Sequence, residues 1–111
     1  MTDTSLSPRP GPVAEYHLHP NHPHWPGLWR QINDPPRDVH VRGRVDILNA
    51  PSIAMVGTRR ATNRGLAVAR ALAAELAAHG WVVVSGLALG IDGQAHRGAL
   101  SVQGKSVGVM A

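Results

Sequence analysis

The sequence predicts an α/β fold built on a parallel sheet. Two short apolar runs, at about 52–56 and 81–85, each end in a polar turn that carries glycine, and a segment of helical character follows each turn. Strand, turn and helix occur twice in succession, as a βαβ pattern requires. The turns of such units lie at the carboxyl ends of the strands, where open α/β folds bind ligands. We therefore expect function around Gly57-Thr58-Arg59 and Ser85-Gly86.

The elements of this half follow one another closely. Gly57 ends the first strand, Thr62 is the expected N-cap of the first helix, and Gly80 ends that helix. Its expected apolar face contains Leu66, Ala69, Leu72, Ala73 and Leu76. Helices at about 63–79 and 92–102, with a third strand at about 106–111, complete the first half of a three-layer domain. Strand order 3-2-1 is expected for this winding.

The residues before this half fall into two segments. Residues 1–24 are rich in Pro and His without an apolar period, which predicts a disordered tail. Residues 25–50 are expected to be a lead-in that packs on the main domain at 51–111. There Trp25, Leu28, Trp29 and Ile32 have the spacing of one helix face. An edge strand at 39–43 and one more turn at 46–48 should follow.

Four histidines of the tail form an H-x-H-x-x-H-x-H cluster at His17, His19, His22 and His24. Imidazole suits zinc, copper or nickel. Pro20 and Pro23 interrupt the run, and neither cysteine nor a ligand-spaced acid accompanies it. We therefore interpret the cluster as part of a polar tail and predict no metal site.

Charge and composition indicate which classes of partner and cellular location suit the chain. The net charge is +4, and residues 1–50 carry five Arg against five Asp or Glu, so the excess lies in residues 51–111. A basic excess beside turns rich in N–H groups suggests an anionic partner. The chain has no cysteine, which suits a cytoplasmic protein, and no apolar run long enough to suggest a membrane span.

Familiar catalytic and cofactor motifs are absent. Neither turn has the G-x-G-x-x-G spacing of a dinucleotide site, and Gly104-Lys105-Ser106 lacks the first glycine of a P-loop. Ser85 lacks the flanking glycines of a G-x-S-x-G nucleophile. We predict no enzyme activity, no cofactor and no metal. A phosphate-binding edge remains, in which N–H groups after Gly57 and Gly86 cradle an anion beside the Arg59 fork.

Residues 25–111 resemble a known family. The stretches IAMVGTRRATNRG, VVVSGLALGIDGQAHRGAL and GKSVGVMA, with WPGLWRQINDPPRDVHVRG upstream, are similar to the DNA-processing protein A (DprA or Smf) family. The resemblance implies a Rossmann-like domain that binds single-stranded DNA and loads the RecA recombinase during natural transformation and recombination. Homodimers of full-length members, with recombinase contacts in a second half, are also implied; a membrane is not.

Site residues follow from the matching motifs. The resemblance implies DNA contacts at Gly57, Thr58 and Arg59 of the first turn, and at Ser85 and Gly86 of the second. Asp92 and His96 belong to the G-I-D-x-x-A-H motif and are expected to organise the helix start rather than touch DNA. Leu89 replaces the usual Arg of S-G-L-A-R-G-I-D, which removes one basic contact.

Two alternatives remain open at this stage. The related lysine-decarboxylase-like phosphoribohydrolases also use a Rossmann-like domain on nucleotides, and a P-G-G-x-G-T motif further on would identify them. The second alternative is that the chain is a fragment without independent function. The coding sequence downstream of residue 111 discriminates between these and a DNA-binding protein.

Overall fold

The computed structural model describes residues 13–110 and divides into two compact units between Asp46 and Ile47. The division falls a few residues before the predicted boundary at 50/51. The expectation of a disordered tail concerns residues 1–12 as well, which lie outside the described residues. That the lead-in packs on the main domain stays a prediction, and each unit is described by itself.

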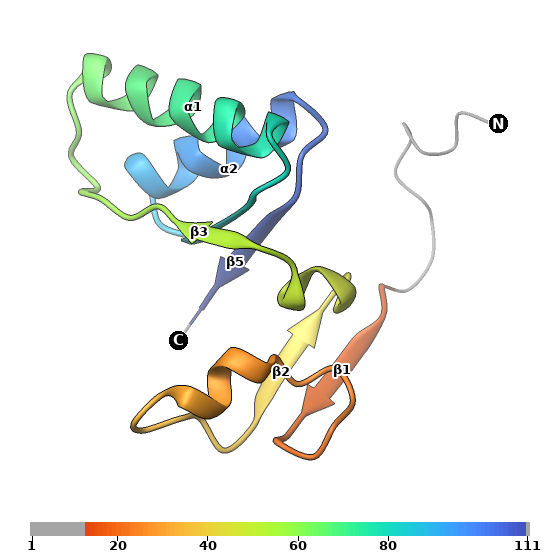
Figure 1. Ribbon diagram of the computed structural model, residues 1–111. Helices are drawn as coiled ribbons and strands as arrows, with labels where there is room; N and C mark the ends of the chain where they lie inside the picture. The colour runs from red at the N-terminus through yellow and green to blue at the C-terminus, as the bar shows by residue number, and fades with distance from the viewer. Residues whose placement is uncertain (1–12, 111) are drawn as a thin grey trace, which may run out of the picture. The chain divides into compact units, whose positions relative to one another are not determined.

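The second unit is an α/β unit with a parallel sheet (Figure 1). Its elements in chain order are β3 (Ser52–Ala54), α1 (Asn63–Ala78), β4 (Val82–Gly86), α2 (Ile91–Ser101) and β5 (Ser106–Val109). The order β3-β4-β5 with parallel pairing confirms the predicted winding. Consecutive right-handed crossovers put both helices on one side of the sheet, as Figure 1 shows. The described residues of this unit thus form two layers of the expected three.

Helix α1 begins as the sequence predicts. The Thr62 side chain accepts a hydrogen bond from the Gly65 N–H at 3.0 Å, which satisfies one of the free donors of the first turn. Gly80 has a φ of +92°, a conformation that glycine adopts without steric cost, and it ends the helix. Across residues 13–110, no helix combines the length and apolar character needed to cross a membrane.

The contact between α1 and α2 is made by small residues. The buried positions are Ala69, Ala73 and Ala77 of α1 with Ala95, Gly98 and Ala99 of α2. Val83 of β4 is fully buried beneath them and joins the same cluster. Leu72, predicted on the buried face, is instead 50% exposed. The helix turns its alanines inward because only small side chains allow so close an approach of the two backbones.

The first unit contains a two-stranded antiparallel sheet of β1 (Glu15–Leu18) and β2 (Val39–Arg42). Strand β2 was predicted, but β1 lies within the segment predicted to be disordered, so that prediction is wrong for residues 15–18. The segment has few apolar residues because β1 buries only one side chain fully, that of Leu18, and the strand was therefore not recognised from the sequence. A further turn, η3 (Asp46–Asn49), begins at the last residue of this unit, continues into the second unit and agrees with the turn expected at 46–48.

The expected helix face around the tryptophans differs from the structure. Only a short 3-10 helix, η2 (Gly27–Gln31), forms here. Trp25 is buried and meets the half-buried Trp29 edge-to-face, with ring centroids 5.0 Å apart, but Leu28 is 75% exposed. Because η2 covers only residues 27–31, Trp25 and Ile32 lie outside it, and the four apolar side chains do not form one helix face.

Candidate functional site

The two predicted turns lie next to each other at the carboxyl edge of the sheet. The Met55 N–H donates to the Val84 carbonyl at 2.8 Å, and the Ser85 hydroxyl donates to the Met55 carbonyl. These bonds extend the pairing of β3 and β4 up to the point where the two turns begin. The predicted juxtaposition of the first turn with the second is therefore confirmed.

Asp92, in the first turn of α2, connects both turns. Its Oδ1 accepts a hydrogen bond from the Gly57 N–H at 3.3 Å, and the residue is 8% exposed. Gly86 approaches the same carboxylate so closely that an added Cβ would lie 2.6 Å from Oδ2. A carboxylate in the first turn also interacts favourably with the positive end of the helix dipole. This agrees with the organising role expected for Asp92.

His96 lies one helical turn after Asp92 in α2 and holds the Ser85-Gly86 turn in place. Its Nε2 lies 2.6 Å from the Gly86 carbonyl oxygen, and its Nδ1 lies 2.5 Å from the Ser106 Oγ at the start of β5. Because a carbonyl only accepts, Nε2 carries the proton, and in the neutral ring Nδ1 accepts from the Ser106 hydroxyl. One imidazole thus links α2, β4 and β5 beneath the edge, as expected for a packing role.

The first turn is anchored to α2 through Thr58. The Thr58 carbonyl accepts from the Ile91 N–H at 3.2 Å, and the Thr58 hydroxyl accepts from the Arg60 N–H at 3.1 Å. Gly90, with a φ of +78°, passes so close that a Cβ there would overlap the Thr58 carbonyl oxygen and lie 2.8 Å from the Arg59 Cα. The turn is held by its backbone, while the side chains of Arg59 and Arg60 are exposed.

The five predicted site residues differ in their exposure to solvent. Gly57, Thr58 and Arg59 are exposed and Gly86 is half-buried, but Ser85 is only 3% exposed and its hydroxyl is bonded to Met55. The N–H of Gly57 itself donates to Asp92, whereas the expected anion cradle uses the N–H groups that follow Gly57 and Gly86. The Asp92 carboxylate thus satisfies the last donor before the turn, and the cradle formed by the following N–H groups stays a prediction.

One exposed side chain beside this site was not selected from the sequence. Arg60 follows Arg59 directly, and both are exposed in the same turn. The adjacent pair in G-T-R-R was the signal that could have found it. On the other turn Leu89, at the position where the resembling family carries Arg, is exposed.

Comparison with known proteins shows the family of the chain. The family described as DNA recombination-mediator protein A matches residues 16–111. The chain belongs to this family. Family relatives include the DNA processing protein DprA of Bacillus subtilis, 39% identical over 88 residues, and a DNA processing protein of Mycobacterium tuberculosis named as putative, 52% identical over 68 residues. These alignments cover 78% and 61% of this chain, but 30% and 18% of the relatives.

Solved structures of family members share the fold. The crystal structure of DprA from Streptococcus pneumoniae matches with a TM-score of 0.79 and 32% identity, covering 85% of this chain and 33% of that one. A DprA structure from Helicobacter pylori, described in terms of its single-stranded DNA binding mode, matches with a TM-score of 0.72, 34% identity and the same 85% coverage, over 41% of that chain. The chain therefore spans less than half the length of these relatives, from 18% to 41%.

Proposed function

We propose that this chain binds single-stranded DNA at the carboxyl edge of its parallel sheet. The observation that carries the proposal is the exposed turn Thr58-Arg59-Arg60, which the Ile91 N–H of α2 joins through the Thr58 carbonyl and which the Thr58 hydroxyl braces from within. Two guanidinium groups on a fixed turn present charged forks to a phosphate backbone. The Helicobacter pylori relative, whose description names single-stranded DNA binding, supports the same ligand here.

In this proposal the predicted residues divide into contacts and supports. Thr58, Arg59 and the neighbouring Arg60 approach the phosphates. Gly57 and Gly86 position the two turns, because the absence of a Cβ leaves room for Ile91 and Asp92 of α2. Ser85 acts as a support, because its hydroxyl is buried against Met55 and would have to break that bond to reach DNA. Asp92 and His96 hold the two turns in register.

Replacement of Arg59 by alanine tests the assignment. The side chain is exposed, so R59A should leave the circular dichroism spectrum native-like while weakening oligonucleotide binding by about 1.5–3 kcal/mol, the usual size of a charge-assisted contact. R59K should recover only part of the loss, because an ammonium lacks the planar fork. Arg97 is equally cationic and exposed but lies within α2, so R97A is the matched control. Equal losses of affinity in R59A and R97A would contradict the assignment, because they would show that binding depends only on overall positive charge.

The salt dependence of binding tests the electrostatic part. Residues 51–111 carry six cationic side chains against two acidic ones, an excess of four. Binding through phosphates releases counterions, so the logarithm of affinity should fall with the logarithm of salt at about 0.7 per phosphate neutralised on a single strand. Fluorescence anisotropy with oligonucleotides of two unrelated sequences measures this slope. Retained binding with a slope near zero would contradict the proposal.

Recombinase loading and dimerisation are proposed for the whole protein. The family description as a recombination mediator supports loading of a RecA-type recombinase onto the bound strand. This chain covers 30–33% of the Bacillus subtilis and Streptococcus pneumoniae proteins, so these activities are assigned to the full-length molecule. Recombinase assembly on single-stranded DNA, with full-length protein carrying or lacking R59A, tests whether the turn contributes.

A further inference from the structure

The small sheet of the first unit brings together ligand-type side chains that are far apart in the sequence. In the β1–β2 register His17 lies directly opposite His40. Asp38 comes two residues before His40, and residues two apart along an extended chain point to the same face. All three side chains are exposed. Antiparallel pairing thus brings one histidine of the H-x-H-x-x-H-x-H run close to a histidine of β2 and to the acid just before that strand.

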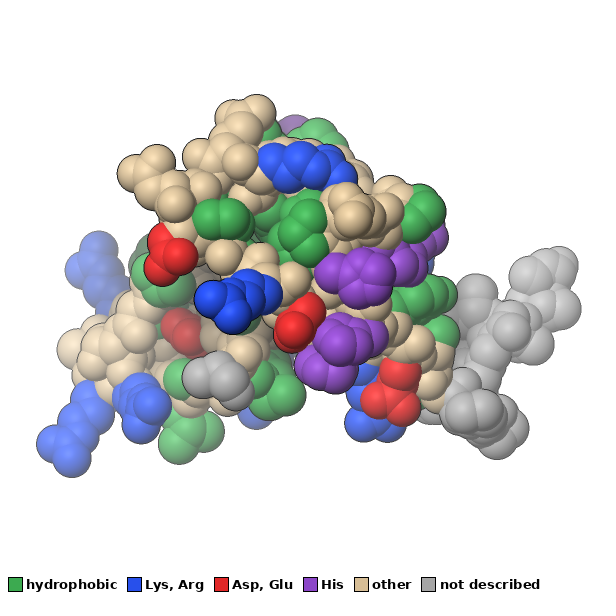
Figure 2. Space-filling view, turned by 90° about the horizontal axis from the view of Figure 1, so that it is seen from below, with side chains coloured by type: hydrophobic (Ala, Val, Ile, Leu, Met, Phe, Trp, Pro, Cys, Tyr) green, Lys and Arg blue, Asp and Glu red, His purple; other side chains and the backbone are tan. Residues whose placement is uncertain are grey.

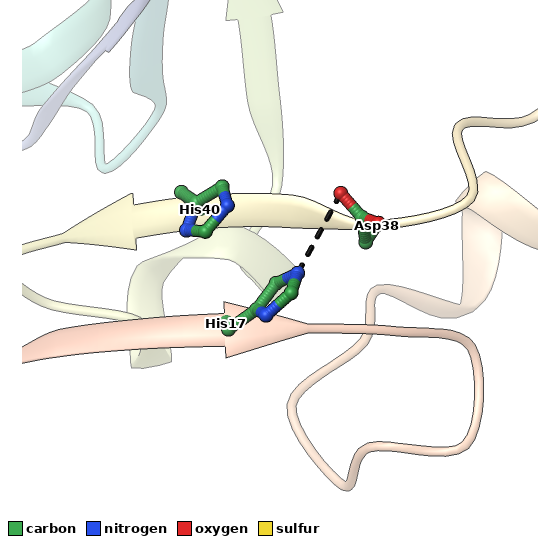
Figure 3. Close-up of side chains that lie close together, drawn as sticks. All are labelled: His17, Asp38 and His40. Atoms are coloured by element: carbon green, nitrogen blue, oxygen red, sulfur yellow. Dashed lines mark ion pairs between the residues drawn. The ribbon is translucent and has the colours of Figure 1, made fainter.

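The distances among these groups approach those of a metal site (Figure 3). One ligand atom from each of His17, Asp38 and His40 lies within 4.8 Å of the other two, and the His17 Nε2 is 3.6 Å from the Asp38 Oδ1. Ligand atoms around a tetrahedral zinc ion are about 3.4 Å apart, given bonds of about 2.1 Å. The His17–Asp38 pair is already near that separation. Rotation of the exposed His40 ring, now stacked on His17 with centroids 4.2 Å apart, would bring in the third ligand.

We propose that His17, Asp38 and His40 form a binding site for a divalent transition-metal ion of the zinc, copper or nickel class. Two imidazoles and one carboxylate are donors that this class prefers, whereas magnesium and calcium favour all-oxygen sets. Three protein ligands leave a position open to water or to a further donor. On the face seen in Figure 2, histidine side chains gather in one patch with acidic side chains beside it. The His19 ring lies beside the site, with its centroid 6.2 Å from that of His17, but the proposed ligands are His17, Asp38 and His40 alone.

The ion would cross-link β1 to β2. A two-stranded sheet is marginally stable in water by itself, and these strands are separated by the long segment 19–38. A metal bound only by the paired strands stabilises the pairing by mass action. The site therefore predicts a zinc-dependent gain in the order of the first unit, independent of DNA binding at the sheet edge of the second.

Zinc titration of the 111-residue chain tests the site. Isothermal calorimetry with ZnCl₂ should give one equivalent, and H17A and H40A should each weaken affinity at least about tenfold, the lower end of what even outer-sphere partners contribute to metal sites. D38N, which keeps the shape but removes the charge, should also weaken it. The control is H79A, because His79 lies at the end of α1 in the other unit. Amide exchange of Tyr16 and Val41, which pair across the strands, should slow when zinc is added.

A second variant separates this site from the histidine run alone. The triple substitution H19A/H22A/H24A keeps His17, Asp38 and His40 and should retain the site within a few fold. Loss of binding in the triple variant with retention in H40A would assign the ion to the run and overturn the proposal. Absence of zinc binding by the unsubstituted chain, or one equivalent that survives both H17A and H40A, would overturn it as well.

Discussion

Gly98 lies where α2 comes closest to the backbone of α1. A Cβ built at this position would overlap the Arg70 carbonyl oxygen and lie 3.0 Å from the Ala73 Cβ. Backbone cannot yield as a flexible side chain does, so the two helices would have to separate. A separation of α1 from α2 would also disturb Asp92 and His96, which hold the site from α2.

We predict that G98A lowers the free energy of unfolding by about 1–3 kcal/mol, the usual cost of overpacking a core. Gly93 of the same helix is the matched control, because its added Cβ would meet nothing closer than 3.5 Å. G93A should instead stabilise by about 0.5–1 kcal/mol through reduced backbone entropy. Urea denaturation followed by circular dichroism measures both. Equal effects of the two substitutions would show that the helices are less closely packed than described.

Single residues show where sequence reasoning succeeds and fails. Thr62 and Gly80 act through bonds to their own helix, and local pattern predicted both. Ser85 was predicted to face a ligand, but its partner Met55 lies thirty residues away, on a neighbouring strand. The pairing of β3 with β4 was predicted from the sequence. Whether the Ser85 hydroxyl bonds to a carbonyl of β3 or faces solvent depends on side-chain geometry, which the spacing of residues in the sequence does not indicate.

At the level of elements, helix α1 depends on its cap. The four N–H groups of a first turn lack intrahelical partners, and the Thr62 Oγ1 accepts the one at Gly65. We predict that T62A destabilises the chain by about 1 kcal/mol and speeds amide exchange at Gly65. N63A, one residue later and exposed, removes no cap bond and should be neutral or slightly stabilising. Unchanged exchange at Gly65 in T62A would mean that water replaces the cap without loss.

The faces of elements were harder to predict than their existence. Both helices and all three parallel strands lie where apolar runs and glycines indicated, with ends shifted by a few residues. The buried face of α1, however, uses alanines, and Leu72 points out. A periodic pattern containing both Leu and Ala is consistent with several rotations of the helix. The choice is made by α2, whose Gly98 accepts only a small neighbour. Strand β1 was missed because it pairs with β2 more than twenty residues later.

At the scale of the whole molecule, the sheet of residues 47–110 has a strand at each edge that pairs on one side only. Among the described residues 47–110, β4 pairs on both sides, whereas β3 and β5 each pair on one. Exposed apolar side chains follow the strands and turns at the carboxyl end: Val56, Leu87, Leu89, Val109 and Met110. An unpaired strand edge beside apolar side chains is a template for another chain. Burial of that surface would be favourable at about 25 cal/mol per Å².

We therefore predict that the 111-residue chain self-associates as its concentration rises, through the β5 edge. Sizing chromatography with light scattering should show a mass above 11.8 kDa that falls on dilution. The double substitution V109K/M110K places charge beside the open edge and should restore a monomer. The matched control is V68K/L72K, which charges two exposed apolar positions of α1 instead. If the control alone abolished association, the helix face rather than the strand edge would be the contact. A sharp monomer of the unsubstituted chain at all concentrations would contradict the prediction.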